Sequence, residues 1–394
     1  MSLSHLSLRA QKIKPSPTMA ITNRAKLLQA EGKDLISLTV GEPDFDTPEF
    51  IKDAARDALN KGYTKYTAVD GIPELKQAVI NKFERDNKLS FSPKEISAAA
   101  GCKQSVYNTI QALISEGDEV IIPAPYWVSY PDMVLLADGK NIFIETTSEQ
   151  SFKITAEQLE KAITPKTKLL ILNSPSNPTG ICYSRKELEK LAEVLLKHPQ
   201  VYILSDDMYE HIIWGAEKFC NILMACPALK SRTIICHGVA KSYAMTGWRI
   251  GYAAGPVEII TAMNNIQSQS TSNPNSIAQY AAVAALNGDQ TCVHEMTAAY
   301  QRRHQIVFEG LSKIKNIKVL PATGTFYSFP DISNAMKHYK NDLELCEALL
   351  VEAGVVVVPG SAFGCGTGFR IAYATSEELL HKAMERLQKW WGHS

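Results

Sequence analysis

The sequence lacks the features that would place it in several specialised classes of protein. No apolar run approaches the eighteen or so residues that a membrane-spanning helix needs. The 41 basic and 41 acidic residues balance and form no long run of one sign, which argues against nucleic acid or a membrane surface as a partner. The first residues have no apolar core of the signal-peptide type. We therefore expect a cytoplasmic protein whose partners are small molecules.

Patterns that would indicate disulfides, a metal or a dinucleotide are also missing. The eight cysteines are scattered without a C-x-x-C pair, and several fall inside apolar runs, so we expect reduced core residues and no metal site. A dehydrogenase of the dinucleotide-binding type would need G-x-G-x-x-G after its first strand. The only similar glycines, Gly364, Gly366 and Gly368, have the wrong spacing and lie near the C-terminus. This argues against that class of enzyme.

Length and periodicity predict two domains. The chain has 394 residues, of which 45% are apolar, which is too long for one small core. Before residue 95, the patterns predict a strand at 35–40 and a helix at 72–87. Between Glu95 and Gly255, short β-rich runs alternate with amphipathic helices, two of which begin with capping boxes at Thr155 and Ser184. This alternation predicts a mainly parallel sheet covered on both faces. We expect an N-terminal segment, residues 1–45, that packs with a smaller α+β domain at 288–394, and a large domain at 46–287.

The unusual residues follow the ends of the predicted strands, where such sheets bind ligands. Gly101, Cys102 and Lys103 open a helix after the strand at 96–100, and a helix N-terminus with free N–H groups suits a phosphate. Trp127 follows the strand at 119–123, where it could either pack in the core or stack on a flat cofactor. At the helix start and at Trp127, the sequence alone does not decide between a cofactor site and ordinary structural residues.

Two further strand ends carry polar groups. Asn177 lies in a turn held by two prolines and a glycine, where its amide can donate to a ring oxygen. Asp206 follows the strand at 201–205, where a carboxylate would be costly to bury unless a cation or a protonated nitrogen paired with it. Tyr209 comes three residues later and adds a phenol.

The stretch from 233 to 255 places Lys241 and Arg249 between two apolar strands. An unpaired ammonium is costly to desolvate, but an amine whose pKa is lowered by burial can form a Schiff base. The alternative is a lysine at the tip of a turn that reaches solvent. Together, the strand ends match pyridoxal 5′-phosphate part by part, because that cofactor has a phosphate, a flat ring, a phenolic oxygen, a ring nitrogen and an aldehyde.

The motifs SPSNPTG, SDDMYEH and VAKSYAMTGWRIGY, in this order, resemble the class I aminotransferases of the pyridoxal-phosphate fold type I superfamily. KPSPT, GEPDFDTP, YWVSYP and FRIAYA are similar to bacterial aspartate aminotransferases, including the branch that also accepts prephenate. The resemblance covers nearly the whole chain. It implies an α/β fold with a mainly parallel seven-stranded sheet between helices, a smaller α+β domain, and a homodimer with shared active sites.

The resemblance also implies how the cofactor is held. Lys241 would form the Schiff base and then act as the base that moves the substrate proton. Asp206 would keep the ring nitrogen protonated, and Asn177 and Tyr209 would hydrogen-bond the phenolic oxygen. Trp127 would stack on the ring. The phosphate would be held by Arg249, by the N–H groups of Gly101, Cys102 and Lys103, and by Tyr66 from the second subunit. The chain departs from many relatives at Gly238, where they have a serine or threonine that binds the phosphate.

For the substrate, the resemblance implies that Arg370 grips the α-carboxylate with help from the Gly41 backbone, beside Trp127 and Asn177. Lys103 would bind a distal carboxylate, and Lys14 would serve a bulky dicarboxylic substrate, although a solvated surface lysine is an equal alternative at that position. The implied reaction exchanges an amino group between L-aspartate and 2-oxoglutarate. An aromatic or alanine aminotransferase, or a carbon–sulfur β-lyase on the same scaffold, is the alternative.

Overall fold

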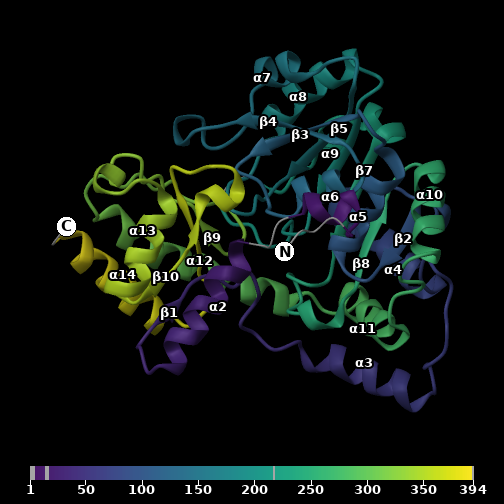
Figure 1. The fold of residues 1–394 in the computed structure, drawn as a ribbon. Helices are drawn as coiled ribbons and strands as arrows, with labels where there is room; N and C mark the ends of the chain where they lie inside the picture. The colour runs from purple at the N-terminus through teal and green to yellow at the C-terminus, as the bar shows by residue number, and fades with distance from the viewer. Residues whose placement is uncertain (1–4, 14–16, 216–217, 393–394) are drawn as a thin grey trace.

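A seven-stranded sheet forms the centre of the protein. The structure is a computed structural model that describes residues 5–13, 17–215 and 218–392. The sheet has the strand order β2-β8-β7-β6-β5-β3-β4 (Figure 1). Its strands are β2 (Ile96–Ala99), β3 (Glu119–Ala124), β4 (Lys140–Glu145), β5 (Thr167–Asn173), β6 (Tyr202–Asp206), β7 (Thr233–Gly238) and β8 (Gly251–Ala254). β8 runs antiparallel to both of its neighbours and the other pairs are parallel, which confirms the predicted sheet.

Helices cover both faces of this sheet because its central strands are apolar on both sides. Leu169 and Ile171 of β5 belong to one core cluster, and Leu170 and Leu172 belong to another, as strand alternation requires. The helices of this half are α3 (Glu49–Asn60), α4 (Pro73–Lys82), α5 (Cys102–Leu113), α6 (Tyr130–Leu136), α7 (Ala156–Ala162), α8 (Arg185–Lys197), α9 (Ile222–Ala225), α10 (Val257–Ser268) and α11 (Ser276–Asn287). α5 packs on β7 and β8, and α8 packs against α7 and α9.

The C-terminal part is built from helices and short strands. It contains α12 (Thr291–Ser312), α13 (Asp342–Ala348), α14 (Glu377–Gly392), β9 (Tyr327–Ser328), β10 (Val355–Val356), β11 (Val358–Pro359) and β12 (Phe369–Ala372). β11, β12 and β9 form an antiparallel sheet, and α14 packs along α12. This part lies beside the large sheet, at the left of Figure 1.

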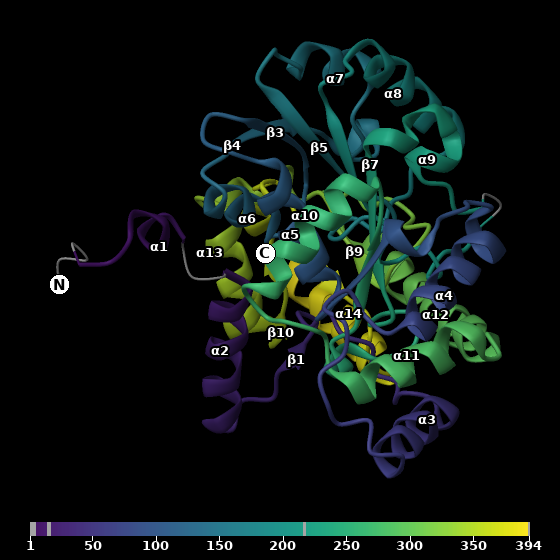
Figure 2. The same ribbon diagram turned by 90° about the vertical axis from the view of Figure 1, so that its right-hand side faces the viewer.

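The N-terminal segment contacts both parts. α2 (Pro17–Ala30) packs Ala25 and Leu28 against Leu350 and Val356, and Figure 2 shows it beside α13 and β10. β1 (Ile36–Ser37) pairs in parallel with β10. The short helix α1 (Leu8–Lys12) instead packs against α6, where Lys12 forms an ion pair with Asp138 at 2.8 Å. The domain boundaries given above stay a prediction.

Two predicted elements are shorter in the structure. The strand expected at 35–40 is regular only at β1, because Leu38 turns from the edge of β10 to bond both Val356 and Ala372. The helix expected at 72–87 ends at Lys82, and a π-helical turn covers Phe83–Asn87. None of the eight cysteines, all of them described, forms a disulfide, and the described residues contain no helix long and apolar enough to cross a membrane.

Candidate active site

The carboxyl ends of β5, β6 and β7 bring the predicted polar residues together. Asn173 at the end of β5 lies opposite Asp206 at the end of β6. The Asn173 amide donates to the Asp206 main-chain carbonyl at 2.9 Å, and its oxygen accepts from the Asn177 N–H at 2.8 Å. Asn173 thus fixes the turn of Asn177 to the strand of Asp206, a role that sequence reasoning missed because nothing but its place at a strand end marks it.

Asp206 is buried and held by three donors. The Tyr130 hydroxyl donates to Oδ2 at 2.6 Å, while the Met208 N–H and the Cys102 thiol donate to Oδ1 at 3.3 and 3.8 Å. Burial raises the pKa of Asp206, and these hydrogen bonds oppose the rise. Tyr130 belongs to the motif YWVSYP, but the sequence analysis singled out only Trp127 from that motif.

The amine of Lys241 turns into the protein. Nζ donates to the Gly41 carbonyl at 2.7 Å, so the alternative of a lysine that reaches solvent from a turn tip is wrong. Burial lowers the pKa of Lys241 to about 8, with the charges of Arg249 and Arg370 adding to the effect and Glu42 opposing it. An amine with this pKa is partly neutral near pH 7, which suits a nucleophile or a base.

Arg249 lies against the N-terminus of α5. Its Nη1 donates to the Thr246 carbonyl at 2.9 Å and its Nη2 to the Ala100 carbonyl at 3.4 Å. The helix begins after Gly101, which has φ 91° and no side-chain cap, so the first N–H groups have no side-chain acceptor from the N-cap. A Cβ at Gly101 would collide with the Arg249 guanidinium, so only glycine allows this approach.

The same tight packing explains Gly238. A Cβ at this position would lie 2.9 Å from both the Gly251 Cα and the Ile250 carbonyl oxygen, because β8 passes directly beside the end of β7. A serine or threonine therefore has no room here. Any phosphate bound at this turn must rely on Arg249 and the α5 N-terminus instead.

Arg370 on β12 is buried beside Asn177. Its Nη1 donates to Asn177 Oδ1 at 3.0 Å and its Nη2 to the Thr39 carbonyl at 2.6 Å, whereas the buried Nε has no partner. The guanidinium lies 4.5 Å from the centroid of the Tyr327 ring. Burial lowers the pKa of Arg370, although its value stays far above neutral pH because guanidinium is so basic.

Tyr327 joins Arg370 to Tyr209. The Tyr209 and Tyr327 hydroxyls lie 3.0 Å apart, and burial raises the pKa of both phenols. Tyr327 also lies close to Gly41, where a Cβ would meet its hydroxyl. No sequence pattern distinguishes Tyr327 from the other aromatic residues of the stretch GTFYSFP.

Lys103 opens onto a cavity of about 450 Å³ at the other side of the α5 N-terminus. Its ammonium lies 4.9 Å from the centroid of a Trp127 ring, and burial together with the Arg249 charge lowers its pKa. The cavity is lined by Ala100, Lys103, Gln104, Tyr107, Ser129, Asp132, Met133, Leu136, Arg249, Ser270 and Thr271. Lys103 and Arg249 therefore share one open space.

Two predicted residues stand apart from this site. Tyr66 is 92% exposed, so it does not take part in the site of its own chain. Lys14 lies outside the described residues.

Among the described residues, the positive charges of the site are not held in ion pairs. Within the described part of the chain, Lys103, Lys241, Arg249 and Arg370 form no ion pair with a carboxylate. The buried Arg370 Nε and the uncapped N-terminus of α5 are further donors that the protein leaves unmatched. Pyridoxal 5′-phosphate fits this donor set, since a phosphate suits Arg249 and the helix, an aldehyde suits Lys241, and the buried Asp206 suits a protonated ring nitrogen.

Comparisons with known proteins identify relatives of this chain. An aspartate/prephenate aminotransferase of Nitrosomonas europaea is 55% identical over 97% of this chain and 98% of its own. The crystal structure of an aspartate aminotransferase from Rhizobium meliloti has a TM-score of 0.95 at 48% identity and covers 98% of both chains. The Thermus thermophilus aspartate aminotransferase with maleate has a TM-score of 0.92 at 44% identity and covers 98% of this chain and 99% of its own.

The family model for aminotransferases of class I and II matches residues 33–387. This span includes the large sheet, the α5 N-terminus and both Lys241 and Arg370. The chain therefore belongs to the class I and II aminotransferases, a family that depends on pyridoxal 5′-phosphate.

Proposed function

We propose that this protein is an aspartate aminotransferase that moves the amino group of L-aspartate to 2-oxoglutarate, giving oxaloacetate and L-glutamate in a ping-pong reaction. The observation that carries the proposal is a group of positive charges, Lys103, Lys241, Arg249 and Arg370, that form no ion pair with a carboxylate among the described residues. A dicarboxylic substrate together with a phosphorylated cofactor supplies negative charges for Lys103, Arg249 and Arg370, and the cofactor aldehyde suits the amine of Lys241. The names of the relatives support the choice of aspartate.

The cofactor would be held by residues from four strand ends. Arg249 and the N–H groups of Gly101, Cys102 and Lys103 would bind its phosphate, and Tyr66 of a second subunit would complete that site. Trp127 would stack on the ring, while Asp206, Asn177 and Tyr209 would meet its polar atoms. When bound, pyridoxal 5′-phosphate supplies the aldehyde that takes up the amino group and the ring that takes up the electrons of the Cα–H bond.

The substrate would be held at both of its carboxylates. Arg370 would take the α-carboxylate as a planar two-pronged donor by exchanging its present bonds to Asn177 and the Thr39 carbonyl. Lys103 would take the distal carboxylate, and the Gly41 backbone would border the α-carboxylate. The maleate in the Thermus thermophilus structure is itself a dicarboxylate.

Lys241 would move the proton at the substrate Cα. Its pKa of about 8 lets the amine accept a proton near neutral pH and return it. In the present structure this amine donates to the Gly41 carbonyl, next to the segment that also binds Arg370. Lys241 and Arg370 therefore bracket the volume in which the substrate amino acid would lie.

The homodimer, the domain boundaries at 46–287 and 288–394, and the cytoplasmic location belong to the same proposal. Tyr66 supports the dimer, because an exposed tyrosine in a polar loop can reach a site on another chain. Arg370 comes from the C-terminal part and Lys241 from the large sheet, so a bound substrate would draw the two parts together and exclude water.

Prephenate is a second candidate substrate. The observation in its favour is the name of the Nitrosomonas europaea relative, aspartate/prephenate aminotransferase. Prephenate also carries two carboxylates, so it would use the same Arg370 and Lys103 contacts, and Lys14 would serve its bulkier body.

A single-turnover spectral titration tests the proposal. The yellow cofactor-loaded protein is mixed with L-aspartate, L-glutamate, L-phenylalanine and L-alanine, and each active donor is then paired with oxaloacetate, 2-oxoglutarate and prephenate. We expect aspartate and glutamate to bleach the yellow band rapidly, with alanine and phenylalanine slow. Failure of both acidic amino acids would contradict the proposal and favour the lyases or aromatic donors of the same scaffold.

A further inference from the structure

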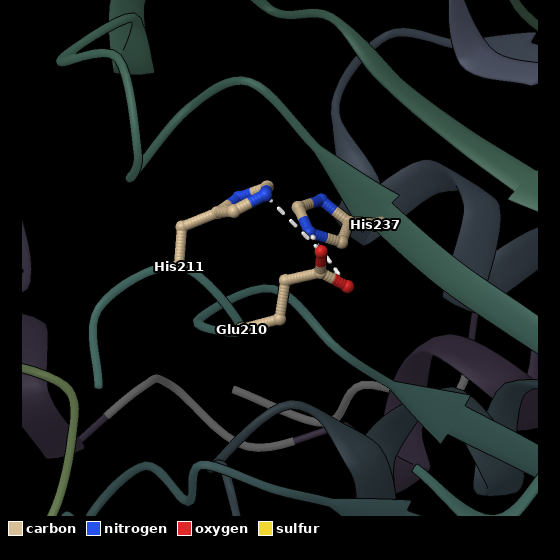
Figure 3. Close-up of side chains that lie close together, drawn as sticks. All are labelled: Glu210, His211 and His237. Atoms are coloured by element: carbon tan, nitrogen blue, oxygen red, sulfur yellow. Dashed lines mark ion pairs between the residues drawn. The ribbon is translucent and has the colours of Figure 1, made fainter. Parts of the chain in front are cut away.

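A cluster of buried and half-buried charges lies behind the active site. It consists of Lys82, Asp86, Glu210, His211 and His237, which we name the rear cluster. The Lys82 ammonium forms a close ion pair with the Glu210 carboxylate and donates to Asn87 Oδ1 at 2.8 Å. In Figure 3 the rings of His211 and His237 both face the Glu210 carboxylate. The side chains of Lys82 and Glu210 are only 0% and 2% exposed, so this pair has no access to bulk water.

The rear cluster carries its own cation. Ligand atoms of Glu210, His211 and His237 lie within 4.8 Å of one another, which is a spacing that a metal ion could use. The Lys82 ammonium already neutralises that carboxylate, and a divalent ion beside it would be repelled. Burial alone would raise the pKa of Glu210, but the charge of Lys82 holds it at about 2, so the carboxylate stays ionised.

The rear cluster is joined by the chain to two active-site residues. Glu210 and His211 directly follow Tyr209, and Ser242 directly follows Lys241. His211 Nδ1 lies 3.2 Å from the Ser242 Oγ, and Ser242 is buried. One imidazole therefore bridges the segment that carries Tyr209 and the turn that carries Lys241.

The two nitrogens of His211 have different partners. Nε2 lies 3.0 Å from Asp86 Oδ2 and 3.2 Å from Glu210 Oε1, so two carboxylates keep a proton on this nitrogen. Nδ1 shares a hydrogen bond with the Ser242 hydroxyl, and the carboxylates fix the plane of the ring.

We propose that His211 is a positioning residue that fixes the turn carrying Lys241 through its hydrogen bond to Ser242, while the carboxylates of Asp86 and Glu210 orient the imidazole. The proposal rests on the proposed function, because the placement of Lys241 matters only if its amine takes part in the reaction. An amine displaced by even a fraction of an ångström from its reacting position loses rate without losing substrate affinity.

A matched set of variants tests separately the contact of Nδ1 with Ser242 and the contacts of Nε2 with the two carboxylates. The amide nitrogen of Asn overlaps His Nδ1, and that of Gln overlaps Nε2. His211→Asn therefore keeps a donor toward Ser242, whereas His211→Gln keeps the donor toward the carboxylates and loses the serine. Ser242→Ala removes the serine hydroxyl directly. We expect His211→Gln and Ser242→Ala to lower kcat by about tenfold with KM for aspartate nearly unchanged, and His211→Asn to stay nearer the wild type.

A second measurement reports the pKa of the Lys241 amine directly. In the cofactor-free protein, the pH dependence of reductive methylation at Lys241, followed by peptide mass spectrometry, reports its pKa. We expect the midpoint to rise in His211→Gln and Ser242→Ala, because a loosened turn lets water reach the ammonium. This labelling is independent of turnover, so its outcome is distinct from a failure of the proposed aminotransferase reaction.

A double variant tests whether the two substitutions act through the same hydrogen bond. The double variant His211→Gln with Ser242→Ala should be no more impaired than either single variant, since both remove the same bond. Thermal melting of each variant checks folding. Wild-type kcat and an unchanged labelling midpoint in a folded Ser242→Ala would overturn the proposal. Equal impairment of His211→Asn and His211→Gln would also overturn it, because the imidazole would then act through its carboxylate side.

Discussion

Among the described residues, charged side chains form ion pairs with one another in the rear cluster, whereas Lys241 and Arg370 of the active site do not. In the rear cluster every charge is matched, since Lys82 pairs with Glu210 and Asp86 is bonded by His211 and Arg85. In the active site, Lys241 donates to the Gly41 carbonyl, and Arg370 donates to the Asn177 side-chain oxygen and the Thr39 carbonyl, which are all uncharged acceptors. Both regions are built on one segment, 205–211, whose residues Asp206 and Tyr209 serve the active site while Glu210 and His211 serve the rear cluster.

The difference shows which charges are structural and which await a ligand. Desolvating a charge costs several kcal/mol unless a partner offsets it, so an internally matched cluster is stable without further molecules. Arg370 is buried and Lys241 is half-buried, and neither forms an ion pair with a carboxylate among the described residues, which is costly and is retained where a bound anion or aldehyde supplies the partner. Lys103 and Arg249 are exposed, so water solvates them until a ligand binds. Substitutions of the Lys82–Glu210 pair and of the active-site cations should therefore fail differently, with lost stability in the first case and lost turnover in the second.

The largest effect should follow Lys241→Ala. This variant removes both the amine that the cofactor aldehyde takes and the base at the substrate Cα, so transamination should fall by about 10⁴-fold or more while the cofactor still binds. Steady-state rates and the absorbance of the loaded protein measure these two properties. Normal transamination by Lys241→Ala would contradict the role assigned to Lys241.

Lys82→Met should act on stability instead. It leaves the Glu210 carboxylate buried without its partner, which should lower the free energy of unfolding by about 3–5 kcal/mol. Urea unfolding measures this loss. Lys382→Met is the matched control, because that lysine pairs with Asp34 at the surface with 51% of its side chain exposed and should cost no more than about 1 kcal/mol.

A double variant tests whether the lost stability comes from the unpaired Glu210 charge. Adding Glu210→Gln to Lys82→Met removes the uncompensated charge and should recover part of the lost stability. Equal unfolding free energies for Lys82→Met and Lys382→Met would show that the rear cluster is not a matched buried pair.

Arg370→Lys keeps the charge but loses the planar fork. Since a charge-assisted hydrogen bond contributes about 1.5–3 kcal/mol, kcat/KM should fall by about a hundredfold for every amino acid substrate, acidic or not. Stability should change little, because the aliphatic part of lysine still fills the space beside Tyr327. A loss confined to aspartate and glutamate would mean that Arg370 binds the distal carboxylate instead.

A pH response is expected from Asp207. Burial and the nearby Glu210 charge raise its pKa from 3.8 to about 7, so the folded protein holds this carboxyl protonated. Its stabilising contribution is complete below pH 3.8 and is lost as the pH rises through about 7. Asp207→Asn, which keeps an amide beside Ser205 and Asn221, should flatten the stability profile in that window. An unchanged profile in urea unfolding would contradict this assignment.

The sequence predicted the sheet well because its strands are short apolar runs between capped helices. The predicted strand at 119–123 became β3 at Glu119–Ala124, and the capping boxes at Thr155 and Ser184 do begin α7 and α8. The strand at 35–40 was overestimated, because its pairing depends on β10 and β12, which are far away in the sequence. Local patterns carry no information about such distant partners.

The same limit applies to the site. Residues in long motifs, such as Lys241 and Asp206, could be placed from strand ends and the family resemblance. Tyr130, Tyr327 and Asn173 were missed because they act on other side chains, and that role depends on contacts across the fold. The rear cluster was missed for the same reason, since Lys82 and Glu210 lie 128 positions apart and look like ordinary helix and loop charges in the sequence.

The central claim is that the active-site cations bind the carboxylates of the substrate. A calorimetric titration of the cofactor-loaded protein with succinate and with butyrate tests this claim most directly. The two acids differ in one carboxylate, so Lys103 should make succinate bind at least about tenfold more tightly. That preference should disappear in Lys103→Met while the affinity for butyrate stays the same. Equal affinities for the two acids in the wild type, or a preference that survives Lys103→Met, would contradict the assignment of Lys103 and the charge argument behind it.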